Sequence, residues 1–368
     1  MESALSNEQK LVLLSSRLSQ DIDKEELERF LSFDIAWEKV FEYASRNKVL
    51  FLMSENIRKC GYEEKLPKYF KLLVKDGLQC NVIRNTEKLK ALEEVCKKLE
   101  SEDIKIVPVK GAYLIDNVYG DRSVRTTNDM DALIKKKDIQ KIDEVMKKLG
   151  YTSDKYDANT GQFKPRSVTE KMLYKTKMYN LLPYVKTIEV PLESQIEFDF
   201  SHALDFSLDI QPVEEMINNS FIEGGIRQLK PEHFFVHMCC HHYREASHTE
   251  WIRLGKDLNL IKFCDVRAFV MNKMDKRSMN AALKFAAKHK VERAVYFTLH
   301  FLEIIYNDGY ERAVLQQLNI EDEDFIYLFG ENEYVETKRR KKAFWNSFFD
   351  PDNTEELAEK TKYDELMK

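Results

Sequence analysis

The sequence lacks the features of exported and membrane-spanning chains. Its six cysteines are scattered and form no CxxC pair, so they predict neither a disulfide framework nor a thiolate metal site. No run of ~18 apolar residues occurs, and the start MESALSNEQKLVLL has neither the basic beginning nor the continuous apolar stretch of a signal peptide. We therefore expect reduced thiols, a cytoplasmic location, and neither export nor membrane spanning.

An excess of positive charge is also missing. The chain has 58 Lys and Arg against 63 Asp and Glu, which gives a net charge of -5 and a pI near 6.0. Such a balance provides no general basic field to hold a polyanion, so we do not expect nucleic acid as a partner. Hydrophobic residues make up 43% of the chain and charged residues 33%, which is typical of a globular protein rather than a disordered one.

Proline- or glycine-rich linkers and internal repeats are absent as well, so domain boundaries must come from changes in hydrophobic pattern. Residues 7–100 have helical periodicity, for example over 86–101, and helical patterns return after Pro231. Between them, short apolar runs alternate with helical patterns. We predict an α+β fold with a small mixed β-sheet core (101–228), flanked by a helical N-terminal region (1–100) and a C-terminal helical domain (229–368). The basic cluster KRRKK (338–342) is interpreted as a solvated helix face.

The predicted core contains three strands. IKIVPVKG (104–111) is an apolar run closed by Gly111, and MDALIKKK is a second strand, followed by an amphipathic helix, KDIQKIDEVMKKLGY. In SQIEFDFSH three apolar residues point one way and Glu197 and Asp199 the other, which predicts a half-buried strand with an acidic face. The stretch 151–192 is polar and irregular, with strand-like pieces such as TEKMLYKTKMYNLL.

The candidate chemistry begins with two aspartates in RTTNDMDALI (125–134). Asp129 and Asp131 lie two positions apart where a polar turn becomes an apolar strand, so their side chains share one face. Neighbouring carboxylates repel unless a proton or a cation lies between them. Oxygen ligands of this kind suit Mg²⁺, and a third acid from Glu197 or Asp199 would complete a site for two ions.

A phosphate-binding turn is expected next to these acids. Lys110, Gly111 and Ala112 form the transition from strand to helix, where backbone N–H groups can approach an anion. The Lys110 ammonium adds a positive charge. Arg125 either holds a phosphate or pins the turn.

The run VPVKGAYLIDNVYGDRSVRTTNDMDALI, followed by a helix ending in LGY, resembles the catalytic segment of a bacterial family of uncharacterised nucleotidyltransferases, a branch of the DNA polymerase beta-like superfamily. IEFDF resembles the family's later acidic strand, and HFFVHMCCHHYREA with LIKFCDV its helical tail. The superfamily's Gly-Ser pair is Gly111-Ala112 here, so no serine hydroxyl assists phosphate binding. The positions that match the family's motif are Lys110, Gly111, Ala112, Tyr119, Arg125, Asp129 and Asp131.

The resemblance implies an enzyme that moves a nucleoside monophosphate from an NTP, with ATP the expected donor, to a small-molecule, peptide or protein acceptor. Asp129 and Asp131 would bind two Mg²⁺ ions. Glu197, which falls where the family's acid stands, is preferred as the third ligand, with Asp199 close behind. The alternative is a catalytically inactive module of the same fold that senses nucleotide.

A histidine-rich helix offers a second possible site. His233, His237 and His241 recur every four residues on one helix stripe, close to Cys239 and Cys240. Zinc sites usually bring spaced cysteine pairs, so core or site-lining histidines are favoured over a zinc site. We expect His237 and His241 to face the nucleotide.

Overall fold

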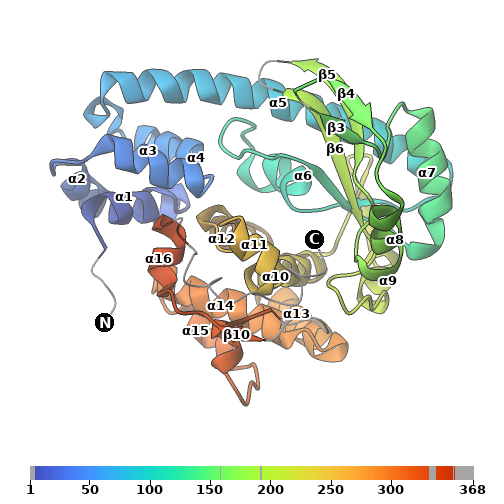
Figure 1. Ribbon diagram of the computed structural model, residues 1–368. Helices are drawn as coiled ribbons and strands as arrows, with labels where there is room; N and C mark the ends of the chain where they lie inside the picture. Colours follow the sequence, from blue (N-terminus) through green and yellow to red (C-terminus); the bar gives the residue numbers. More distant parts are fainter. Residues whose placement is uncertain (1–4, 158, 191–192, 331–336, 351, 353–368) are drawn as a thin grey trace. The chain divides into compact units, whose positions relative to one another are not determined.

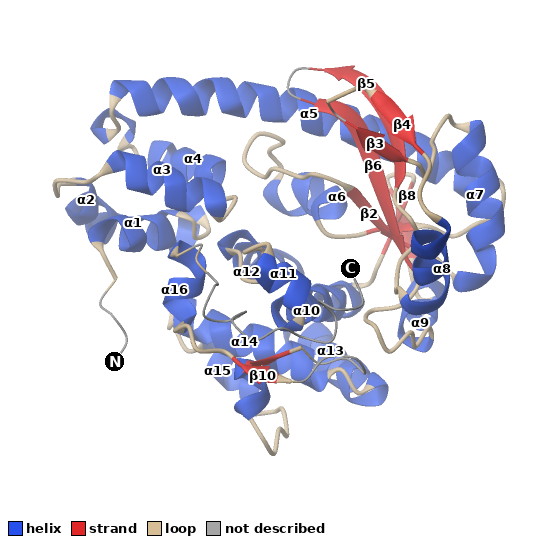
Figure 2. Ribbon diagram, viewed as in Figure 1, coloured by secondary structure: helices blue, strands red, loops and turns tan. Residues whose placement is uncertain are grey.

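The computed structural model describes residues 5–157, 159–190, 193–330, 337–350 and 352. Most of these residues are helical, and one four-stranded sheet is the largest β structure among them (Figures 1 and 2). This is the predicted α+β class. No helix in the described part of the chain is both long enough and apolar enough to cross a lipid bilayer. The helices are α1 (Asn7–Ser15), α2 (Lys24–Leu31), α3 (Trp37–Arg46), α4 (Leu50–Lys59), α5 (Lys68–Ser101), α6 (Gly111–Leu114), α7 (Ile139–Lys148), α8 (Val168–Lys177), α9 (Gln211–Asn218), α10 (Pro231–Ser247), α11 (Thr249–Arg253), α12 (Leu260–Lys273), α13 (Lys276–His289), α14 (Glu292–Tyr306), α15 (Tyr310–Leu315) and α16 (Phe344–Phe349).

The chain forms two compact units that are interleaved along the sequence. The first comprises Met1–Asp76, Cys239–Met271 and Ala286–Lys368, and the second comprises Gly77–Met238 and Asn272–Phe285. The first unit is mainly helical, and its core includes clustered aromatic rings such as Phe263, Phe301 and Phe348. The second unit contains the four-stranded sheet. The division into three consecutive regions stays a prediction.

The sheet has the strand order β1-β2-β6-β5. Its strands are β1 (Val107–Pro108), β2 (Met130–Leu133), β5 (Tyr184–Val190) and β6 (Glu193–Ser201). β1 pairs with β2 and β5 with β6 in antiparallel orientation, whereas β2 and β6 are parallel. The sheet is therefore mixed, and its two central strands carry the acidic segments. The remaining strands form two-stranded pairs: β3 (Lys155–Asp157) with β4 (Gln162–Lys164), β7 (Phe221–Glu223) with β8 (Ile226–Gln228), and β9 (Leu328–Phe329) with β10 (Lys338–Arg339).

One face of the sheet is apolar and packs into the core of the second unit. Side chains from β2 and β6, including Ala132, Phe198 and Phe200, cluster with Ile142 of α7 and Leu92 of α5. Burying one face in this way fixes the strand registers, because a shift by one residue would turn the apolar set to the opposite side. The acidic residues of both strands are consequently directed to the other face.

Two local predictions were wrong. Residues Val168–Lys177 form helix α8 rather than strand-like pieces. The α8 helix has no buried residue. The hydroxyl of Ser167, the residue before its first turn, accepts a hydrogen bond from the Glu170 amide and caps the helix. The basic cluster at 338–342 is not a helix face either, because Lys338 and Arg339 pair with β9 and Arg340 forms a buried ion pair with Asp257 at 2.7 Å.

Candidate active site

Three carboxylates from the two central strands converge on the polar face of the sheet. In the parallel ladder between β2 and β6, Asp131 lies directly opposite Asp199. Asp129 immediately precedes β2 and is two residues from Asp131, so it shares the same side. Each of the three side chains offers an oxygen, and these oxygens all lie within 4.8 Å of one another. The predicted meeting of acids from separate strands is thus present.

Lys110 and Asn180 already bind carboxylate oxygens of this acidic group. The Lys110 Nζ lies 2.6 Å from Oδ1 of Asp131. The Asn180 side-chain amide donates to both carboxylate oxygens of Asp199, at 2.9 and 3.2 Å. Burial, together with the negative charges of Asp129 and Asp199, raises the pKa of Asp131 to about 8. A cation between the three carboxylates would offset their mutual repulsion, and hard oxygen donors are the ligands that Mg²⁺ prefers.

Glu197 lies beside this group without being part of it. It precedes Asp199 by two residues on β6 and so projects from the same face. Burial raises the pKa of its carboxyl, and the charges of Asp129 and Asp199 add to the effect. The sequence left Glu197 and Asp199 open as the third acid, with Glu197 preferred. The structure places Asp199, opposite Asp131, within the group of three carboxylates, and the identity of the third metal ligand stays a prediction.

The turn between β1 and α6 is tightly built. Lys110 has φ 52° and ψ -133°, a conformation that residues with a side chain rarely adopt. A Cβ at Gly111 would lie 2.3 Å from Oγ1 of Thr127 and 2.5 Å from Nη1 of Arg125. A larger residue here would require the side chains of Thr127 and Arg125, from the loop that leads into Asp129, to shift.

Arg125 and Ala112, two of the predicted phosphate-binding residues, are in contact with other parts of the protein. The Arg125 guanidinium lies against Gly111 and donates to the Thr126 carbonyl at 3.1 Å. This contact fits a role in the turn, and phosphate binding by Arg125 stays a prediction. Ala112 is buried in the apolar cluster, so only its backbone can take part in a site. Phosphate binding by Lys110, Gly111 and Ala112 stays a prediction.

Comparison with known families agrees with this geometry. The model of the family described as uncharacterised nucleotidyltransferase matches residues 34–307, about three quarters of the 368 residues. The chain belongs to this nucleotidyltransferase family. No curated protein sequence matches the chain.

The predicted histidine-rich stripe lies on helix α10. His237 is buried, and the two ring nitrogens of His241 lie 3.4 Å from Oε1 of Glu245 and 2.9 Å from Nη2 of Arg244. In the described part of the chain, the group of side chains that could hold a metal contains aspartates alone, without histidine or cysteine. The expected contact of His237 and His241 with nucleotide stays a prediction.

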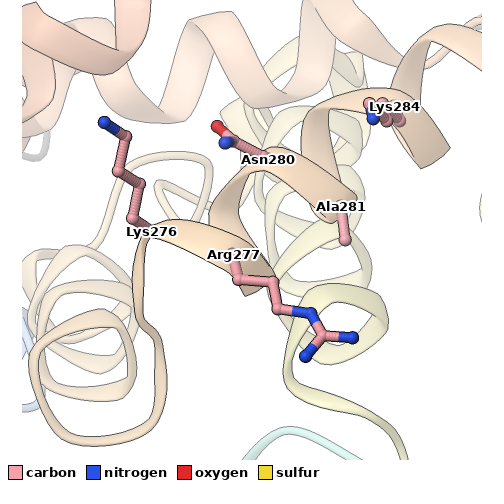
Figure 3. A pocket seen from close by; sticks show the side chains of 5 residues that line it. All are labelled: Lys276, Arg277, Asn280, Ala281 and Lys284. Atoms are coloured by element: carbon pink, nitrogen blue, oxygen red, sulfur yellow. The ribbon is translucent and has the colours of Figure 1, made fainter.

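A cationic hollow lies on α13, and it includes none of the predicted site residues. It is lined by Lys276, Arg277, Asn280, Ala281 and Lys284. Figure 3 shows that the side chains of Lys276 and Arg277 extend away from each other. These cations do not converge on one point, so the hollow does not define a ligand site.

Sequence reasoning missed two polar residues that support the site. Asn180, which holds Asp199, lies in the stretch interpreted as irregular, where no pattern distinguishes it. Lys88 lies on α5 and is fully buried. Its spacing from Leu92, Val95 and Leu99 places it on the apolar face of that helix. A charged residue at a core position was therefore the signal available in the sequence.

Proposed function

We propose that the protein is a Mg²⁺-dependent nucleotidyltransferase that moves a nucleoside monophosphate from an NTP, with ATP the expected donor, to a small-molecule, peptide or protein acceptor. A single observation carries the proposal: three carboxylates converge from two adjacent parallel strands in a member of a nucleotidyltransferase family. Bound divalent ions would supply positive charge to the attacking oxygen and to the leaving pyrophosphate.

The residues have separate roles in this reaction. Asp129, Asp131 and Asp199 would hold two Mg²⁺ ions and the donor phosphates attached to them. The acceptor oxygen forms the new bond to the α-phosphorus while the bond from that phosphorus to the bridging oxygen breaks, and pyrophosphate leaves. Glu197 lies beside the group but outside it, and its raised pKa suits a carboxylate that takes up the acceptor's proton.

Lys110 is proposed to stabilise the donor triphosphate. Its ammonium is paired with Asp131 in the structure, at 2.6 Å. When a divalent cation binds Asp131 in its place, the ammonium can turn to a phosphate oxygen and counter the charge that develops on pyrophosphate. The strained backbone at Lys110 fits such a role, because strain of this kind clusters at functional sites.

The test combines Mg²⁺, labelled NTPs and cell extract, with mass spectrometry to identify which acceptor gains a nucleotide. The wild-type protein should release pyrophosphate and yield a labelled product, and Asp129→Asn should yield neither while remaining folded. Equal product from both proteins would rule out the metal assignment. Mg²⁺-dependent NTP binding without pyrophosphate release, across a panel of acceptors, would favour the nucleotide-sensing module.

A further inference from the structure

One face of α5 donates hydrogen bonds to the loop that leads into the acid pair. The Asn81 side-chain amide donates to the Ser123 carbonyl at 2.5 Å. The Asn85 amide donates to the carbonyls of Arg122 and Arg125, at 2.7 and 2.9 Å. A third residue on this face, one turn further along, is the fully buried Lys88. We call Asn81, Asn85 and Lys88 the loop-holding stripe.

Lys88 uses all of its hydrogen-bonding capacity. Its Nζ donates to the carbonyls of Thr127 and Asn128, at 2.9 and 2.8 Å, and lies 2.7 Å from a carboxylate oxygen of Glu193. An ammonium has three donors, and each has an acceptor here. Arg84 also binds Glu193, at 2.8 Å. Burying a lysine is costly unless it is paired, so this arrangement requires the loop to present its carbonyls in one conformation.

The held carbonyls lie directly before the candidate metal ligands. The Asn128 carbonyl belongs to the peptide bond that joins Asn128 to Asp129, and Asp131 follows two residues later. Fixing the plane of that peptide limits the directions in which the Asp129 side chain can point. Every member of the stripe donates to main-chain oxygens, so the stripe orients the backbone of the loop regardless of its side chains.

We propose that the loop-holding stripe, and Lys88 above all, positions Asp129 for metal binding; this inference rests on the proposed function. The stripe residues are positioning residues and do not touch the substrate. Supporting residues of this kind determine metal affinity, since ligands must be oriented before the ion arrives, and their loss costs about 10- to 100-fold in affinity.

A pair of charge-matched double variants isolates this role. Lys88→Met with Glu193→Gln removes one positive and one negative charge and deletes the bonds to Thr127 and Asn128. Arg84→Met with Glu193→Gln removes the same net charge but leaves Lys88 on the carbonyls. The two variants have the same net charge, but Lys88 also interacts electrostatically with Asp129 and Glu197. Loss of that positive charge alone would favour a cation at the acids, so weaker Mn²⁺ binding by the Lys88→Met pair reports the hold on the loop.

The measurements are Mn²⁺ affinity by electron paramagnetic resonance, hydrogen exchange of residues 122–131, and thermal stability. The Lys88→Met pair should bind Mn²⁺ about 10-fold or more weakly than the Arg84→Met pair, with faster exchange in the loop. Should the Lys88→Met pair not fold, Asn85→Ala, which removes two of the loop bonds and keeps Lys88, replaces it and is expected to weaken Mn²⁺ binding and speed exchange in the same direction.

The outcomes separate this inference from the proposed function. Equal Mn²⁺ affinity and equal loop exchange in the two variants would overturn the positioning role, even with the metal site intact. A wild-type protein that binds no Mn²⁺ would refute the metal site, and the positioning of Asp129 for metal would fall with it. Lower thermal stability with unchanged Mn²⁺ affinity would mean that the stripe is structural alone, which also overturns the proposal.

Discussion

At the scale of single residues, Asp199 and Glu197 are two acids on one strand face with different surroundings. Asp199 lies opposite Asp131 and accepts two hydrogen bonds from Asn180, whereas Glu197 lies outside the group of three carboxylates. We therefore expect Asp199→Asn to weaken Mn²⁺ binding and to lower the rate about 1,000-fold, since a lost metal ligand removes several kcal/mol of transition-state stabilisation.

Glu197→Gln is the matched comparison for that change. It should leave Mn²⁺ affinity within about 3-fold and lower the rate about 100-fold, as expected for loss of a general base. Mn²⁺ titration and pyrophosphate release measure the two effects separately. The reverse outcome, with metal affinity lost in Glu197→Gln and kept in Asp199→Asn, would restore Glu197 as the third ligand.

The buried side chain of His242 leads to a second prediction for a single residue, which concerns the stability of the folded protein in acid. Its ring is buried between Phe263 and Phe297, at centroid distances of 4.2 and 5.8 Å, and neither ring nitrogen has a hydrogen-bond partner among the described residues. Burial lowers the pKa of His242 well below its ordinary value, and the nearby Lys262 charge adds to this. The folded protein therefore keeps the ring neutral at pH values where the unfolded chain binds a proton.

The consequence is a loss of stability in acid. Above pH ~6.5 the ring is neutral in both states, and as the pH falls below that value the unfolded state is favoured by its extra proton. His242→Leu should remove this component and reduce the slope of the unfolding free energy between pH 7 and 5, measured by urea denaturation. The slope should not vanish, because burial also lowers the pKa of His202, His248 and His300. An unchanged slope would contradict the assignment.

At the scale of elements, the turn between β1 and α6 depends on a glycine. In Gly111→Ala the new Cβ would lie 2.3 Å from Oγ1 of Thr127, so the side chain of Thr127, in the loop before Asp129, has to shift. We expect a loss of about 1–3 kcal/mol in the free energy of unfolding, as for other overpacked sites, and weaker Mn²⁺ binding. Adding Thr127→Ala, which removes the closest atom, should recover part of both losses. If Gly111→Ala kept the wild-type free energy of unfolding, the loop would accommodate the new Cβ without a cost in stability, and this prediction would be wrong.

The same scale shows which elements the sequence could predict. Strand β6 and helix α7 were predicted correctly because each buries one face, so apolar residues repeat with the period of the element. Helix α8 buries nothing, and no periodic signal marks it. Helix α5 extends over 34 residues, although only 86–101 has a clear apolar pattern. Before that stretch, Asn81 and Asn85 contact the rest of the protein through hydrogen bonds, which leave no apolar periodicity in the sequence.

Some residues of the candidate site could likewise be predicted from the sequence, and others could not. Asp129 and Asp131 could be predicted from their spacing, because residues two apart share a strand face. The positions of Asp199 and Glu197 relative to this pair could not be predicted, because both lie on one face and the pairing joins strands that are distant in sequence. Lys88 and Asn180 bind residues that are distant in sequence, such as Thr127 for Lys88 and Asp199 for Asn180, through contacts that no local pattern encodes.

At the scale of the whole molecule, the charge distribution limits the acceptor. The net charge is -5, and the basic cluster at 338–342 already pairs with acids: Arg339 binds Asp324, and Arg340 binds Asp257. The buried pair of Arg340 holds that cation away from the phosphates of a nucleic acid, and the net charge provides no general basic field. We therefore expect no transfer of labelled NMP to RNA at physiological salt.

Gel analysis of RNA incubated with labelled NTP, Mg²⁺ and the protein tests this expectation across salt concentrations. An RNA acceptor would need several phosphate contacts, and a slope near -3 in log affinity against log salt would correspond to about four of them on a single strand. Such a slope, with label in the RNA, would replace the small-molecule or peptide acceptor by a nucleic acid. The cationic hollow on α13 would then be the first surface to examine, and a variant with Lys276, Arg277 and Lys284 changed to alanine should flatten the slope. Unlabelled RNA together with a labelled small molecule or peptide would instead agree with the acidic balance of the chain.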